Sequence, residues 1–181
     1  MGVSQKLVKA SRTMAWLSLL GAIVYVAGEI FVFLMPDAAH ALGAIEVHHI
    51  GTIPITAAIP FAYRLAALVV DLIPTALVAW ALIELYRLFQ HYARGEVFSV
   101  AALGNLNRVA ALMFWQVLAS FVCQAPISYI LSLYRPAGHR EISLGLGSND
   151  LAFLFMAGVV LVIARVMAEA RRMADENESF V

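Results

Sequence analysis

Four long apolar runs, separated by shorter polar stretches, dominate the sequence. They cover residues 13–35, 65–86, 109–133 and 151–167. A helix needs about 20 apolar residues to cross the roughly 30 Å hydrocarbon core of a bilayer. Inside that core backbone polar groups must be paired internally, so each run is predicted to be an α-helix. The pattern therefore predicts an all-α fold, a four-helix transmembrane bundle that forms a single integral membrane domain over residues 1–181.

Basic residues are distributed unevenly between the two sides of these spans. Nine of the twelve Lys and Arg residues lie on the side that carries both chain ends, and three lie on the other. Cytoplasmic segments of multi-pass proteins carry the excess of Lys and Arg. Both termini, the inner connector 87–108 and the tail 168–181 are therefore predicted to be cytoplasmic. The loop 36–64 is predicted to lie outside and, being mostly apolar, to pack on the bundle or lie in the interface.

Composition excludes several classes of protein. The chain is 62% hydrophobic and 13% charged, whereas soluble domains are about 45–50% apolar and about 25% charged. Twelve basic and twelve acidic residues cancel, so no net field attracts nucleic acid. The single cysteine, Cys123, excludes an internal disulfide and a cysteine-based metal framework. Without a long polar stretch, a nucleophilic triad or a phosphate-binding glycine loop, the chain is expected not to be an enzyme.

Two cytoplasmic stretches carry a family resemblance. One runs from Leu85 through Gly-Glu-Val-Phe-Ser at 95–99 to Asn105, and the other covers 163–178 and a final apolar pair. Together with the four spans, they resemble the bacterial inner-membrane "domain of unknown function 2975" family. The resemblance implies a location in a bacterial inner (plasma) membrane. No catalytic residue set is established for the family, so none is carried over to this chain. Because members are often encoded beside a small helix-turn-helix regulator, it also implies a regulatory setting and such a regulator as one candidate partner.

The same two stretches are the predicted partner contacts. Residues 99–107 are predicted to form a helix that runs into the third span, after a turn at a glycine. The leading hypothesis is a non-enzymatic regulatory or accessory subunit that contacts another membrane protein or a second copy of the chain. The predicted contact residues are Gly95, Phe98, Ser99 and Asn105 in the connector and Phe180 and Val181 at the end of the tail.

Polar residues inside the spans give a second hypothesis. Glu29, Asp71 and Gln124 are each predicted to lie roughly 9–13 Å below the outer surface, and Arg64 precedes Asp71 on nearly the same helix face. Charges at membrane depth are costly, so Asp71 is expected to face the bundle interior. This intramembrane polar layer could bind a proton or a cation and serve a small transporter or channel. It could equally be a structural network in which Arg64 or water satisfies the carboxylates.

Histidines outside the membrane give a third hypothesis. Imidazole and carboxylate groups suit zinc or copper, and two histidines could hold a haem. However, a dimetal bundle site needs two Glu-x-x-His pairs, and only one is present. Exposed histidines without a ligand are therefore the simpler interpretation, and no cofactor is predicted. The candidate ligands are His40, Glu46, His48, His49 and His139.

Overall fold

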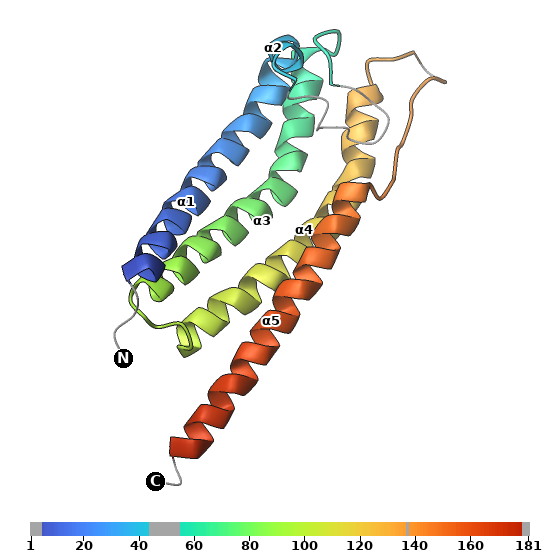
Figure 1. Ribbon diagram of the computed structural model, residues 1–181. Helices are drawn as coiled ribbons and strands as arrows, with labels where there is room; N and C mark the ends of the chain where they lie inside the picture. The colour runs from blue at the N-terminus through green and yellow to red at the C-terminus, as the bar shows by residue number, and fades with distance from the viewer. Residues whose placement is uncertain (1–4, 44–54, 137, 179–181) are drawn as a thin grey trace. The chain divides into compact units, whose positions relative to one another are not determined.

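The regular structure of the chain is entirely helical. A computed structural model describes residues 5–43, 55–136 and 138–178, and no strand occurs among them (Figure 1). The helices are α1 (Gln5–Leu34), α2 (Pro36–Ala41), α3 (Phe61–Ala93), α4 (Val100–Ser132) and α5 (Ser148–Glu178). Four of them, all but the six-residue α2, are long and apolar enough to cross a membrane. The predicted fold class is confirmed.

Each long helix extends beyond the span predicted for it. The connector is mostly helical, because α3 continues to Ala93 and α4 already begins at Val100. At the other end of the chain, α5 continues to Glu178, well past the end of the fourth apolar run. Helices are not obliged to end at the membrane surface, since their backbone bonds stay satisfied in water as well as in lipid.

A glycine turn separates α3 from α4. Gly95 has a φ of 84°, a left-handed conformation that costs glycine nothing and strains other residues. The N–H of Gly95 donates to Tyr92 O at 3.0 Å, and the N–H of Glu96 donates to His91 O at 3.0 Å. These two bonds form a Schellman motif, which pairs the last carbonyls of a helix. The His91 Nδ1 and Glu96 Oε2 atoms, 2.8 Å apart, tie the two ends of the motif together.

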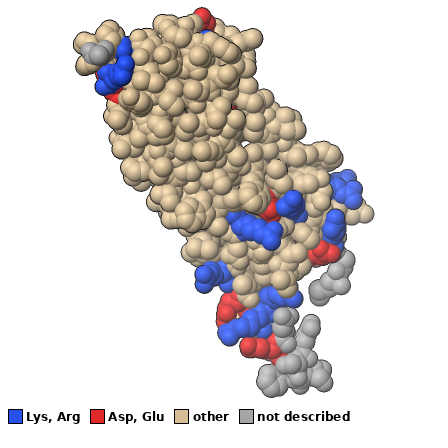
Figure 2. Space-filling view, turned by 180° about the vertical axis from the view of Figure 1, so that it is seen from behind, with Lys and Arg blue, Asp and Glu red and all other residues tan. Residues whose placement is uncertain are grey.

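The chain folds as two compact units. One, the basic-end unit, comprises residues 1–22, 78–114 and 152–181; the other, the loop-end unit, comprises 23–77 and 115–151. Nine Lys and Arg residues belong to the first and three to the second. In Figure 2, Lys and Arg side chains are numerous toward the lower end of the view.

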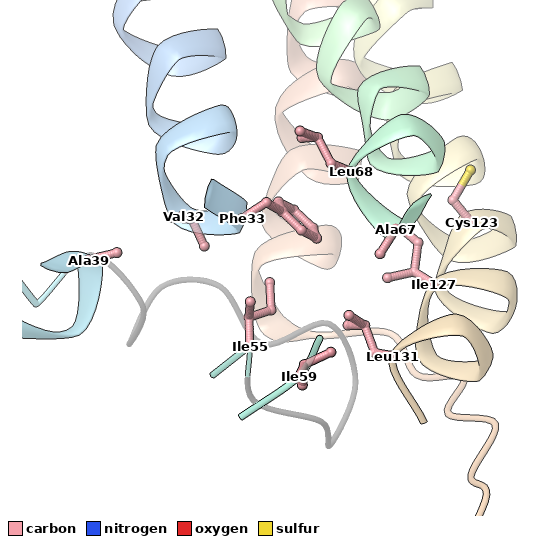
Figure 3. Close-up of a cluster of buried hydrophobic side chains, with 10 residues drawn as sticks. All are labelled: Val32, Phe33, Ala39, Ile55, Ile59, Ala67, Leu68, Cys123, Ile127 and Leu131. Atoms are coloured by element: carbon pink, nitrogen blue, oxygen red, sulfur yellow. The ribbon is translucent and has the colours of Figure 1, made fainter. Parts of the chain in front are cut away.

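The loop-end unit has a core to which the outer loop contributes. Phe33 of α1 and Leu131 of α4 are fully buried, and Ile55 and Ile59 of the loop are 0% and 1% exposed. Figure 3 shows the side chains of this cluster. The described part of the outer loop therefore packs on the helices, because its apolar side chains gain about 25 cal/mol per Å² by leaving water.

The basic-end unit is held by a smaller cluster. Leu88 of α3, Ala102 and Leu106 of α4 and Ala164 of α5 are buried together. Among the α5 side chains of this unit that the structure describes, those of Ala157 and Ala164 are buried, and they lie seven residues apart on one face. Most other apolar side chains of α5 are exposed, which suits a helix surrounded by lipid.

Candidate functional site

A group of polar side chains lies inside the loop-end unit. Glu29 of α1 is 2% exposed and Asp71 of α3 is 9% exposed. The Tyr25 side chain forms a hydrogen bond with Glu29 and lies within electrostatic reach of Asp71. Thr75, one turn after Asp71, donates its hydroxyl to Asp71 Oδ2 at 3.4 Å. Cys123 of α4, also buried, lies within reach of the Asp71 charge.

This arrangement can hold a proton or a cation. Two carboxylates, a phenol and a threonine hydroxyl present oxygen atoms that accept bonds from a cation or exchange a proton. The structure thus places two of the predicted polar residues, Glu29 and Asp71, around one tyrosine. Sequence reasoning missed Tyr25, although its position four residues before Glu29 puts the two on the same helix face.

The other two predicted members of this layer have different partners. Arg64 Nη1 donates to the backbone oxygens of Phe33 at 3.2 Å and Leu34 at 3.3 Å. These carbonyls end α1 and have no partner within the helix, so the guanidinium caps it and complements its dipole. Gln124 Oε1 instead accepts a hydrogen bond from the N–H of Gly145 at 2.9 Å.

Gln124 belongs to a ladder of hydrogen bonds that fixes the segment between α4 and α5. Residues 141–147, here called the strap, run back along α4 (Figure 1). Ser132 Oγ donates to Glu141 O at 3.2 Å, and Ser128 Oγ accepts from Ser143 N at 3.0 Å. Positions 124, 128 and 132 are about 6 Å apart along a helix. Alternate residues of an extended chain are about 6.6 Å apart. The two spacings are similar, so three successive side chains on α4 can each bind one of three alternate strap residues.

The strap determines where α5 begins. Gln124 lies eight residues before Ser132, so the strap descends about 12 Å along α4. The N–H of Gly147 then donates to Asp150 Oδ2 at 2.8 Å, which caps the first turn of α5.

The basic-end unit contains a buried carboxylate that sequence reasoning did not single out. The Glu84 side chain is 1% exposed, and Glu84 Oε1 accepts from Arg87 Nη1 at 2.6 Å and from Trp80 Nε1 at 3.2 Å. Arg108 Nη1 of α4 lies 3.7 Å from Glu84 Oε2. Glu84 therefore joins α3 to the start of α4. Its spacing of three residues from Arg87 was visible in the sequence, whereas the contact with Arg108 depends on how the helices pack.

The connector residues predicted to contact a partner have distinct surroundings. Phe98 is 54% exposed, and its carbonyl accepts from Arg171 Nη1 of α5 at 2.7 Å. The Ser99 hydroxyl accepts from the N–H of Ala102 at 3.1 Å, which is the N-cap bond of α4. Asn105 is 7% exposed, so it packs inside the unit and does not present its side chain to a partner. Phe180 and Val181 lie outside the described residues.

The predicted metal ligands are only partly within the described structure. Glu46, His48 and His49 lie outside the described residues. His40 of α2 has its Nε2 3.2 Å from Ile55 O, so its ring links α2 to the end of the outer loop. His139 is exposed. Among the residues that the structure describes, no three His, Cys, Asp or Glu side chains are grouped as metal ligands would be.

Comparison with known proteins identifies the family. No curated protein and no solved structure is significantly similar to the chain. The model of one family, described as "Protein of unknown function (DUF2975)", matches residues 52–181. The matched region includes α3, α4 and α5 and both stretches that carried the resemblance in the sequence. The chain therefore belongs to the DUF2975 family.

Proposed function

We propose that this protein is a regulatory or accessory subunit of a bacterial inner-membrane complex or signalling system. Its partner would be another membrane protein, a second copy of this chain, or a helix-turn-helix regulator that binds its cytoplasmic side. No catalytic role is proposed. The contact surface is formed by the connector between α3 and α4 and by the part of α5 that continues beyond its apolar run.

One observation carries this proposal: the bond between Arg171 and Phe98 O, 2.7 Å long. It fastens the end of a transmembrane helix to a capped turn 73 residues earlier in the chain. The turn itself is fixed by the left-handed Gly95 and by the Ser99 cap. A preorganised surface loses little conformational entropy when a partner binds, which favours recognition at this place. The exposed ring of Phe98 is suited to be an anchor for such a contact.

Photo-crosslinking can test the contact, and the chain offers a matched control. Phe98 and Phe61 are both 54% exposed. Phe98 lies two residues before α4 begins, and Phe61 is the first residue of α3. A photoreactive phenylalanine analogue is placed at each position in the full chain in its native membrane. We expect a discrete protein–protein product from position 98 and none from position 61. Arg171→Ala should lower the yield of the crosslinked product at position 98, because the carbonyl of residue 98 loses its hydrogen bond from Arg171.

Two results would reject the subunit proposal. One is the absence of any protein product at position 98. The other is the same product at both positions, which would indicate unspecific collision in the membrane. A product whose mass is twice that of the chain would identify a second copy as the partner, and a larger or smaller mass would identify a different protein.

The proposed orientation puts both termini in the cytoplasm, on the basis of the nine basic residues of the basic-end unit. Single cysteines at Ala58 and Ala101, both exposed, test it in a Cys123→Ala background. An impermeant maleimide added to intact cells should label position 58 and not position 101. Labelling of position 101 alone would show that the topology is the reverse of the one proposed.

A second candidate function, proton or cation transport, is favoured by the buried pair Glu29 and Asp71 beside Tyr25. Carboxylates at membrane depth are costly and commonly mark ion pathways. Flux into liposomes that contain the purified protein would measure it. Glu29→Gln and Asp71→Asn should abolish the flux, while Asp37→Asn, at an exposed position on α2, should not. Flux equal to that of empty liposomes would remove this candidate.

A further inference from the structure

In the basic-end unit, the described acidic side chains are all engaged by nearby basic groups. Glu84 is paired with Arg87 and Arg108, and Glu96 with His91. Glu169 and Glu176 of α5 both pair with Arg172. Several cations of this unit have no carboxylate within ion-pair distance among the residues that the structure describes. These cations are Lys6, Lys9, Arg12, Arg94 and Arg165.

The contacts between α1 and α3 place three of these cations within about one helical turn of one another along the helix axes. The rings of Trp16 and Tyr86 lie 6.4 Å apart, and a Cβ atom on Gly21 would be 3.9 Å from Leu82. The two helices are antiparallel neighbours (Figure 1). Arg12 lies one turn before Trp16 on α1, and Gln90 lies one turn after Tyr86 on α3. Arg12 is therefore level with Gln90.

By the same register, Lys9 is level with Arg94, which follows the last residue of α3. Lys9, Arg12 and Arg94 are all exposed. Three like charges at the same level repel one another unless an anion lies between them, and the repulsion is stronger near a membrane, where the local dielectric constant is lower than in water.

The residues next to the three cations indicate what kind of anion is suited to this place. Trp16 is 66% exposed, and its contact with Tyr86 is the amphipathic aromatic pair expected at the boundary between headgroups and acyl chains. Further along α1, Leu17 and Leu20 are 51% and 56% exposed. Cations, then aromatic rings, then exposed leucines follow one another along the helix. This is the order in which a phospholipid presents its phosphate, its glycerol region and its acyl chains.

We propose that α1 and α3 form a binding site for an anionic phospholipid. Lys9, Arg12 and Arg94 surround the phosphate, Trp16 and Tyr86 contact the glycerol region, and the exposed leucines of α1 contact an acyl chain. The site adjoins the proposed partner contact, since Arg94 lies in the connector between α3 and α4. It uses neither Phe98 nor Arg171, so the two proposals can be tested separately. The lipid phosphate supplies negative charge to these three cations. The described residues of the basic-end unit do not supply it.

Binding of defined lipids to the purified full chain tests the site. The protein in neutral detergent is titrated with phosphatidylglycerol or phosphatidylcholine, and bound lipid is counted by native mass spectrometry. We expect tighter binding of phosphatidylglycerol. A basic residue near a membrane surface contributes about 1 kcal/mol toward anionic lipid, which corresponds to roughly a fivefold change in affinity. The double variant Arg12→Gln/Arg94→Gln should therefore bind phosphatidylglycerol roughly 25-fold more weakly, with a smaller loss for phosphatidylcholine, whose choline group offsets the charge of its phosphate.

Two control variants separate a site from a general charge effect. Arg165→Gln removes another exposed cation of the same unit, on α5, and should leave lipid binding unchanged. The charge-conserving double variant Arg12→Lys/Arg94→Lys should retain most of the binding, which guards against loss through misfolding. If Arg165→Gln weakens binding as much as the double glutamine variant does, a defined site on α1 and α3 is refuted.

Inorganic phosphate distinguishes a lipid from a free anion as the ligand. Phosphate lacks the glycerol and acyl parts, so it should bind far more weakly than phosphatidylglycerol and displace it only at high concentration. Equal affinity for inorganic phosphate would overturn the lipid assignment. Equal affinity for phosphatidylglycerol and phosphatidylcholine in the wild-type chain would overturn the role of the three cations.

Discussion

Ser128→Ala is expected to release the strap from α4. The Ser128 side chain is fully buried, and its hydroxyl accepts the N–H of Ser143 at 3.0 Å. The same oxygen lies 3.4 Å from Ser143 O and donates to Ala125 O at 3.0 Å. Alanine removes the only described partner of the Ser143 amide and leaves the rest of the helix face unchanged.

The size of the effect follows from that unpaired amide. Leaving a buried backbone donor without a partner costs about 1–3 kcal/mol, which is more than the net value of the bond itself. Since every 1.4 kcal/mol is a factor of ten, local opening of the strap should become roughly five to 150 times more frequent. Ser143 lies part of the way down α4, where lipid offers no replacement for the lost bond.

Amide hydrogen exchange in lipid nanodiscs measures this opening directly. Peptides that cover the strap should exchange faster in Ser128→Ala by that factor, while those from α4 should be unaffected. Ser120→Ala is the matched control, since none of the described hydrogen bonds to the strap comes from Ser120. Unchanged exchange at Ser143 and Gly145 in Ser128→Ala would refute the ladder. A strap that already exchanges at the rate of an unfolded peptide in the wild-type chain would refute it as well.

Four further substitutions probe the basic-end unit, each by thermal unfolding in detergent. Gly95→Val should destabilise the chain by about 1–3 kcal/mol, because valine is strained at a φ of 84°; an unchanged melting temperature would show that the turn can adopt another conformation. Gly104→Ala should be neutral or stabilise by up to about 1 kcal/mol, since it lies inside α4 with nothing within 4 Å of the added Cβ; a marked loss would indicate a close contact there. Glu84→Gln should cost about 1–3 kcal/mol, as a buried carboxylate that faces Arg87 and Arg108 is lost, although both arginines are more than half exposed and partly solvated. Glu169→Gln, in an exposed pair, should change stability by less than about 1 kcal/mol; an equal loss in the two glutamine variants would contradict the importance of burial at position 84.

The sequence alone was sufficient for the elements that depend on local rules and on the bilayer. Four apolar runs of sufficient length predict four helices, because lipid allows few other structures. The turn at Gly95 and the cap at Ser99 were predictable as well, since a left-handed turn favours glycine and a helix start favours a hydroxyl that accepts a backbone N–H. The family was visible in the same connector, and its match over residues 52–181 confirmed it.

Only the tertiary structure decided which partners the polar side chains have. Arg64 was predicted in one layer with Glu29 and Asp71, and the structure shows that it caps α1 by binding Phe33 O and Leu34 O. Gln124 was predicted in the same layer, yet it holds the strap at Gly145. These contacts join residues 21 to 31 positions apart, and no periodicity in the sequence relates them. Local periodicity fixes which face of a helix a residue occupies. What that face meets depends on the register in which the helices and loops pack, and that register is set by many small packing energies distributed over the whole chain.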